Sequence, residues 1–200
     1  MARAFGLAPT AGPVRGVRVT LRAPMIGPAC PASVNALALA LYGRWTVDFE
    51  RLGLAIVDEA RIWLPGRPVP KGRPRAWKSR LVTPPATRKF EGAVAMACSR
   101  VDLVPPRGEE IVVAAHVSAV FKRTGWEDTK KRRELVVKSR LRADLDNVVK
   151  SVLDGAQRSH LIEDDSHVVA VNAWRMVAPF EAPKLEGVIL SLAWCSVVDR

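Results

Sequence analysis

The sequence predicts an α/β fold of the α+β type, in which helices flank a mixed sheet and the elements follow the order β-α-β-α-β-β. Two kinds of apolar pattern support this order. Some apolar runs are β-branched or alternate with polar residues, as in strands, and others recur every three or four residues, as on one helix face. The 200 residues are 48% hydrophobic, which is enough to bury a core.

Residues 1–57 differ from the remainder and predict an N-terminal extension to a domain that spans residues 58–200. The first thirty-two residues are rich in Ala, Gly, Pro and Arg and have no period, which is typical of a poorly ordered arm. Ser33 precedes an apolar run and is expected to cap a short helix. These residues indicate no function.

The domain is expected to begin with a short strand at 61–65, RIWLP, which proline ends. The next segment, GRPVPKGRPRAWKSR (66–80), is so rich in proline and glycine that it predicts a basic loop without regular structure. Thr87 is expected to cap a helix through RKFEGAVAMACSRV (88–101), whose apolar residues recur at helical spacing.

Residues 111–121, IVVAAHVSAVF, are almost wholly apolar and predict a central strand. The basic segment 122–142 follows as a long loop or arm. Asp144 or Asp146 is then expected to begin a helix through VVKSVLDGAQ that loosens at Gly155. HVVAVNAWRMV and LEGVILSLAW predict two closing strands.

The formal net charge is +11, but it is spread unevenly along the chain. Residues 61–89 hold nine Lys or Arg and no acid, and residues 122–142 hold nine basic against three acidic residues. From residue 143 to the end, nine acidic residues outnumber five basic ones. Two basic segments around an acidic one favour a nucleic acid held against an acidic site, rather than an anionic membrane or charge for solubility alone.

Several classes of protein are disfavoured. No apolar run reaches the roughly 20 residues that cross a bilayer, so no membrane partner is expected. Cys30, Cys98 and Cys195 have no short spacing, which suits a reducing cytoplasm, and Cys98 and Cys195 are expected to be small buried apolar side chains. The sequence has no Gly-rich phosphate loop and no activated Ser or Cys signature, and no small-molecule substrate is expected.

The stretch RADLDNVVKSVLDG (142–155) places carboxylates around a single lysine. Asp146, Lys150 and Asp154 are spaced four residues apart, so they would line one face of a helix. Asp144 can converge on Asp146 if it lies in the extended entry to the helix. Both carboxylates would then meet the positive end of the helix dipole.

A second acidic stretch, IEDDSH, carries Asp164 and Asp165 on the loop before the next strand, close enough in sequence to fold back on the helix start. Mg²⁺ usually takes one or two carboxylates, several waters and the substrate phosphate. These acids are therefore predicted to hold Mg²⁺, while the basic loops around them hold the phosphate chain.

Other interpretations of these residues stay open at this point. A helix-start cap together with a surface pair between Asp146 and Lys150 would need no metal. An EF-hand is excluded, because the sixth loop position counted from Asp144 is Val149 and not Gly. The three histidines have no ligand spacing for zinc, although His167 follows the acidic pair closely.

Four segments carry a resemblance to a known family: GRPVPKGRPR (66–75), TPPATRKFE (83–91), RADLDNVVKSVLDG (142–155) and EDDSHVV (163–169). In this order they resemble the RusA-like Holliday junction resolvases, the crossover junction endodeoxyribonuclease RusA family, common in phages and prophages. The likeness covers roughly residues 60–194, and DLDN-x-x-K with the later DD is its most specific part. The family fold, a homodimer of β-α-β-α-β-β domains, agrees with the predicted element order.

The resemblance implies that Asp144, Asp146 and Asp165 bind the metal, Mg²⁺ with Mn²⁺ as a substitute, and that Lys150 is the catalytic lysine. The implied activity is that of a hydrolase, a structure-specific endodeoxyribonuclease. Such an enzyme resolves Holliday junctions by paired symmetric nicks during DNA recombination and repair. Asp154 falls on a family position that is commonly acidic, as does the residue before Asp165.

The partners implied are four-way junction DNA and a second copy of the chain. Lys71, Arg73, Arg75 and Arg142 are expected to hold the DNA backbone. The expected location is the cytoplasm, with the protein encoded by a bacterial host or a phage. Two other classes stay open, a branched-DNA-binding protein without catalysis and a metal nuclease that acts on other branched or single-stranded DNA.

Overall fold

The computed structural model describes residues 49, 51–77, 80–125, 144–178, 180 and 182–198. The predicted N-terminal arm, the helix expected after Ser33 and most of the basic segment 122–142 lie outside these residues. Within the described part, the order β-α-β-α-β-β and the mixed sheet are confirmed. A short hairpin is added to this order between the first strand and the first helix.

Four strands form one sheet in the order β1-β6-β4-β5: β1 (Leu54–Pro65), β6 (Gly187–Val197), β4 (Ile111–Phe121) and β5 (Val168–Val177). β6 pairs antiparallel with both β1 and β4, whereas β4 and β5 are parallel. A parallel pair needs a crossover connection, and α3 (Leu145–Arg158) lies in the chain between these two strands. β5 therefore becomes the edge strand of the sheet beside α3.

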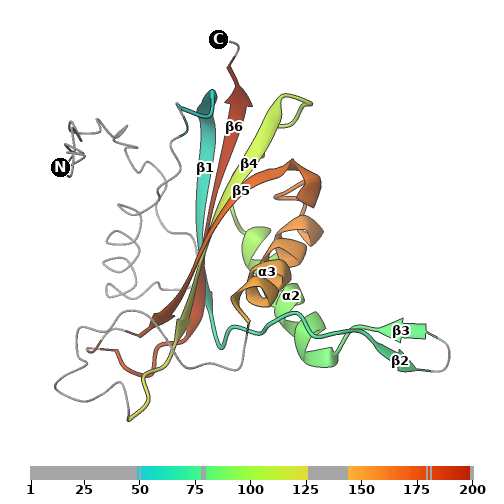
Figure 1. The fold of residues 1–200 in the computed structure, drawn as a ribbon, viewed down its shortest axis with the longest axis vertical. Helices are drawn as coiled ribbons and strands as arrows, with labels where there is room; N and C mark the ends of the chain where they lie inside the picture. The colour runs from blue at the N-terminus through green and yellow to red at the C-terminus, as the bar shows by residue number, and fades with distance from the viewer. Residues whose placement is uncertain are drawn as a thin grey trace, which may run out of the picture.

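The two described helices, α2 (Pro85–Cys98) and α3, pack against each other on the same face of the sheet (Figure 1). Alternate residues of the strands point into the core that forms there, as Val117 of β4 does, and meet Val94 and Val152 from the helices. A smaller apolar cluster around Trp63 lies apart from this core. Neither described helix is long and apolar enough to span a bilayer.

The prediction for the first strand is wrong at its start. β1 begins at Leu54 and not at residue 61, and it pairs with β6 from end to end. Asp58 and Glu59 interrupt the apolar pattern, and the pairing register shifts beside Asp58. The apolar pattern therefore did not predict the first half of the strand. The sheet therefore takes in the last residues of the predicted N-terminal extension.

The prediction of a wholly irregular loop at 66–80 is also wrong. Its C-terminal part forms a short antiparallel hairpin of β2 (Arg75–Trp77) and β3 (Arg80–Val82). Figure 1 shows this hairpin projecting from the body of the molecule beyond α2. Residues 67–74 before it have no regular structure, as their prolines and glycines predict.

Helix α2 begins at Pro85, with Pro84 as its N-cap, so the predicted cap at Thr87 is wrong. Proline suits the first helical position because it has no N–H that would need a partner there. Thr87 is buried, and its Oγ1 accepts a hydrogen bond of 3.2 Å from the backbone N of Gly72. Thr87 thus fastens the basic loop to the start of α2.

The sequence predicted that α3 loosens at Gly155. This prediction is wrong, because the helix continues to Arg158. Instead Gly155 allows α2 and α3 to approach closely. A Cβ atom placed on it would lie 2.5 Å from Cβ of Val94 and 2.8 Å from the backbone O of Glu91. The helix pair therefore requires glycine at this position.

We expect Gly155→Ala to lower the free energy of unfolding by about 1–3 kcal/mol, because the added methyl group forces the helices apart. Gly92→Ala is the matched control, since Gly92 lies in α2 with no atom within 4 Å of the new Cβ. That variant should gain up to about 1 kcal/mol from the better helix former. Urea denaturation measures both, and equal effects of the two substitutions would contradict the close approach of the helices.

Candidate active site

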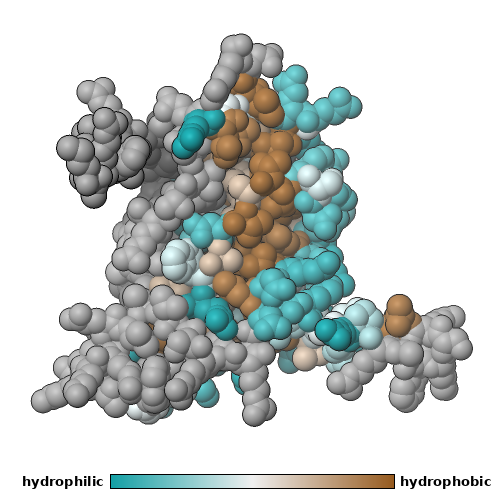
Figure 2. Space-filling view, in the orientation of Figure 1, coloured by the Kyte–Doolittle hydropathy of each residue, from teal (hydrophilic) through white to brown (hydrophobic). Residues whose placement is uncertain are grey.

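An open groove of about 560 Å³ lies between α3 and the edge strand β5. Its apolar lining consists of Leu145, Val149 and Leu153 from α3 and Val168, Val171 and Ala173 from β5. Its charged lining consists of Asp146, Lys150, Asp154 and Asp165. Figure 2 shows an apolar band along the middle of the face that Figure 1 presents, with hydrophilic residues beside it. The groove thus combines an apolar surface with four ionisable side chains.

Helix α3 supplies three of these four side chains. Asp146 lies in its first turn, and Lys150 and Asp154 follow at four-residue steps, so the predicted common face is the one that lines the groove. Asp144 is the N-cap, with extended backbone angles of φ −71° and ψ 134°. Its side chain is exposed and is not one of the groove-lining residues.

The interpretation without a metal required a side-chain cap at the helix start and an ion pair between Asp146 and Lys150. The Asp144 side chain makes no capping hydrogen bond. Among the described residues, no ion pair joins Asp146 to Lys150. In the part of the chain that the structure describes, Asp144 thus occupies the N-cap position without a side-chain cap, and the ion pair is not formed.

Asp165 lines the same groove but comes from a separate segment. It is the first residue of a 3-10 turn, Asp165–His167, that lies directly before β5. Asp164 fixes this turn, because its Oδ1 accepts a 2.9 Å hydrogen bond from the backbone N of Ser166. Hydrogen bonds from the side chain of Ser166, and then from its backbone, lower the pKa of Asp164. Its Oδ2 lies 3.5 Å from Nε2 of Gln157 on α3. Asp164 therefore anchors the loop, whereas Asp165 lines the groove.

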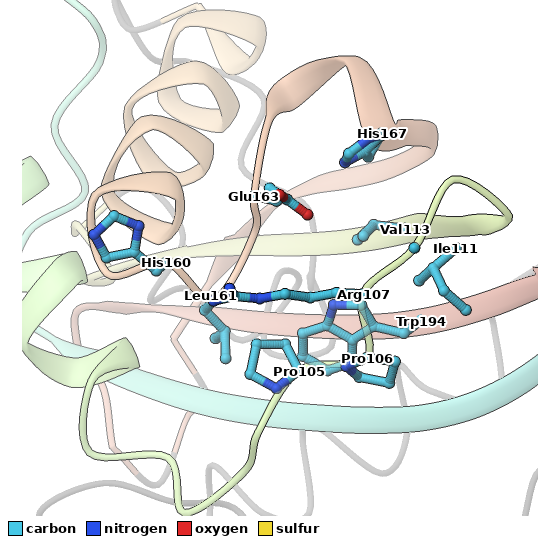
Figure 3. A pocket seen from close by; sticks show the side chains of 11 residues that line it. Pro105, Pro106, Arg107, Ile111, Val113, His160, Leu161, Glu163, His167 and Trp194 are labelled. Atoms are coloured by element: carbon cyan, nitrogen blue, oxygen red, sulfur yellow. The ribbon is translucent and has the colours of Figure 1, made fainter.

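His167 lines a second hollow and not the groove (Figure 3). This hollow has a volume of about 20 Å³, enough for one water, and its charged and aromatic lining includes Arg107, His160, Glu163 and Trp194. Figure 3 shows Glu163 and His167 pointing into it from the segment before β5. The structure thus separates His167 from the predicted metal-binding acids.

The chemistry of the groove fits Mg²⁺ in its donors. Asp146 and Asp165 offer carboxylate oxygens, the ligands that Mg²⁺ prefers, and this ion usually takes only one or two carboxylates from a protein. Within the described part of the chain, no group of three or more Asp, Glu, His or Cys side chains is close enough to hold an ion. The joint ligation by Asp144, Asp146 and Asp165 therefore stays a prediction.

Lys71, predicted to hold DNA, lies in an ion-pair network beside the groove. Its Nζ contacts Oε1 of Glu91 at 2.6 Å and also contacts Oδ2 of Asp154. Burial alone would lower the pKa of Lys71, but hydrogen bonds and attraction from the two carboxylates outweigh burial and raise the pKa. Arg158 completes the network, with NH2 at 2.8 Å from Oε2 of Glu91.

The other predicted DNA-binding residues are only partly described. Arg73 is exposed on the loop before β2. The backbone of Arg75 begins β2, but its side chain lies outside the described atoms, as does all of Arg142. Lys71 and Arg73 are described with their side chains, and of these two Lys71 has its ammonium group bound within the protein.

The sequence did not single out Glu91, whose side chain is fully buried. Glu91 follows Phe90 at the start of the apolar stretch of α2, and Arg88, the cation three residues before Glu91, is exposed. Because an unpaired buried charge is very unfavourable, such a position signals a distant cation. Lys71 and Arg158 are those cations.

An acidic groove with a lysine, on a protein of net charge +11, is typical of enzymes that act on nucleic acid phosphates. The family model described as endodeoxyribonuclease RusA matches residues 65–186, more than half of the chain. The chain belongs to this endodeoxyribonuclease family. The matched segment runs from the end of β1 through β5 and contains all four ionisable residues of the groove. No curated protein matches the chain.

Proposed function

We propose that the protein is a Mg²⁺-dependent, structure-specific endodeoxyribonuclease that resolves Holliday junctions in DNA recombination and repair. The observation that carries the proposal is that Asp146 and Asp165, from separate segments, line one groove with Lys150. Membership of the endodeoxyribonuclease RusA family supports DNA as the substrate. The protein would act in the cytoplasm of a bacterial cell, where it would encounter such DNA.

Asp146 and Asp165, together with Asp144, would hold Mg²⁺, with Mn²⁺ as a substitute. The bound ion would neutralise charge on the attacked phosphate and lower the pKa of a water molecule. Lys150 is exposed in the groove and makes no ion pair with the described residues, so its ammonium is free to meet a phosphate. It would stabilise negative charge on the phosphate or the leaving oxygen, or else orient the attacking water.

Resolution of a junction needs two cuts in opposed strands, and a four-way junction has approximate twofold symmetry. A homodimer with twofold symmetry presents two identical grooves that match this geometry. Arg73, Arg75 and Arg142 would hold the DNA backbone outside the groove. These contacts predict a log affinity that falls by about 0.9 per phosphate contact for each tenfold rise in salt.

The test uses the full chain with synthetic four-way junctions, flaps and linear duplexes in Mg²⁺ or in EDTA. We expect symmetric nicks in the junction only, and only with Mg²⁺, because the groove acids repel a phosphate when no cation is present. A supercoiled plasmid that extrudes a cruciform measures the coupling of the two cuts. A homodimer should convert it to linear DNA, whereas uncoupled single cuts give nicked circles.

Each alternative has its own result in this assay. Binding of the junction without cutting would identify a branched-DNA-binding protein. Preferred cutting of flaps or single strands would identify a metal nuclease for another substrate. Cutting in EDTA at the Mg²⁺ rate would contradict the role of the metal.

A further inference from the structure

Two carboxylates of α3 are spaced for an ion pair with Lys150: Asp146, which is proposed to bind the metal, and Asp154. Asp154 follows Lys150 by four residues, so the side chains of Lys150 and Asp154 are neighbours on the helix surface, and both line the groove. A carboxylate that binds the Lys150 ammonium would compete directly with a phosphate for it. In the structure, however, Asp154 contacts Lys71 and not Lys150.

Lys71 is fixed from several sides in the place where it meets Asp154. Its backbone N donates a 2.7 Å hydrogen bond to the backbone O of Asn147 in the first turn of α3. Its ammonium is held at 2.6 Å by Glu91, a fully buried carboxylate that requires a cation. The side chains of Lys71 and Asp154 are only 24% and 23% exposed, so solvent screens their pairing less than it screens a surface pair.

We propose that Lys71 is a positioning residue of the nuclease, which binds Asp154 and so keeps the ammonium of Lys150 free for the DNA phosphate. This inference rests on the proposed function of the groove. It assigns Lys71 to the interior network and not to the DNA backbone. It also gives Asp154, a commonly acidic position of the family, a role other than metal binding, because its carboxylate is already neutralised by a cation of the protein.

The structure suggests a test that separates this role from simple stabilisation. In Lys71→Met, Asp154 is released and can pair with Lys150, while Glu91 loses one cation. In Lys71→Met combined with Asp154→Asn, Glu91 loses the same cation, but residue 154 has no carboxylate that could pair with Lys150. Any general effect of Lys71→Met on folding is therefore the same whether residue 154 is Asp or Asn. An ion pair between residue 154 and Lys150 can form only when residue 154 is Asp.

We expect Lys71→Met to lower the single-turnover cleavage rate of a saturating junction about two- to fivefold, the factor that corresponds to one ion pair of modest strength. In an Asp154→Asn background, the same substitution should leave the rate unchanged. Thermal unfolding curves establish the temperature at which all four proteins are folded. An equal loss of rate in both backgrounds would overturn the proposal.

A second measurement does not depend on cleavage. Limiting acetic anhydride acetylates a free lysine amine faster than one held in an ion pair, and mass spectrometry of the peptide with Lys150 gives its rate. We expect this rate to fall about two- to fivefold in Lys71→Met and to be unaffected by Lys71→Met when residue 154 is Asn. If the wild type cuts no DNA, the proposed function fails, and this measurement still tests the role of Lys71. An unchanged acetylation rate in Lys71→Met would overturn that role.

Discussion

Asp146→Asn should lower the single-turnover cleavage rate of a four-way junction by about 100-fold or more and leave junction affinity within about threefold of wild type. Asn keeps the size of the side chain and one oxygen but removes the negative charge that a divalent cation needs. Binding persists because the phosphate contacts come from basic residues, and the loss of one carboxylate from the groove reduces repulsion. Quenched-flow cleavage in Mg²⁺ and fluorescence anisotropy in EDTA measure the two quantities.

Asp102→Asn is the matched control for this variant. Asp102 is exposed between α2 and β4, so it undergoes the same chemical change outside the groove, and both activities should stay at the wild-type level. A loss of both binding and cleavage in Asp146→Asn, with a lowered Tm, would give Asp146 a folding role instead. Full cleavage by Asp146→Asn would remove it from the metal site.

The order of the elements followed from the sequence because the strongest patterns lie in the best-buried segments. β4 and α3 are examples: the run at 111–121 has almost no polar residue, and α3 has an apolar stripe opposite its charged face. The sequence did not predict the first half of β1 or the hairpin of β2 and β3. Those segments are stabilised by pairing with a partner strand, which the local sequence does not contain.

The same distinction applies to the site. The helical period alone put Asp146, Lys150 and Asp154 on one face, because residues four apart on a helix are neighbours whatever the fold. The network of Lys71 with Glu91 and Asp154 joins residues 20 and 83 positions apart in the chain. The packing of α2 on α3 brings Glu91 and Asp154 together, and hydrogen bonds from the backbone of Lys71 and Gly72 to these helices place the loop beside them, so no local pattern predicts the network.

Lys150→Ala should lower the single-turnover cleavage rate by about 100- to 1,000-fold, the usual effect of removing one preorganised group that stabilises developing negative charge. Among the residues that the structure describes, Lys150 is the one lysine that lines the groove, and none of them forms an ion pair with it. No described neighbour in the groove could therefore replace its charge. Junction affinity should fall less than the rate, because a group that acts mainly in the transition state contributes little to ground-state binding.

Lys184→Ala tests whether the lost positive charge alone explains the effect. Lys184 is exposed on the turn before β6 and is not one of the groove-lining residues, and its removal lowers the net charge of the protein by the same amount. Lys150→Arg keeps the charge but replaces the compact ammonium with a larger planar guanidinium on a shorter aliphatic stem, so it should recover only part of the rate. Equal rates for Lys150→Ala and Lys184→Ala would mean that the groove lysine acts through general electrostatics, and a catalytic role for Lys150 would then be untenable.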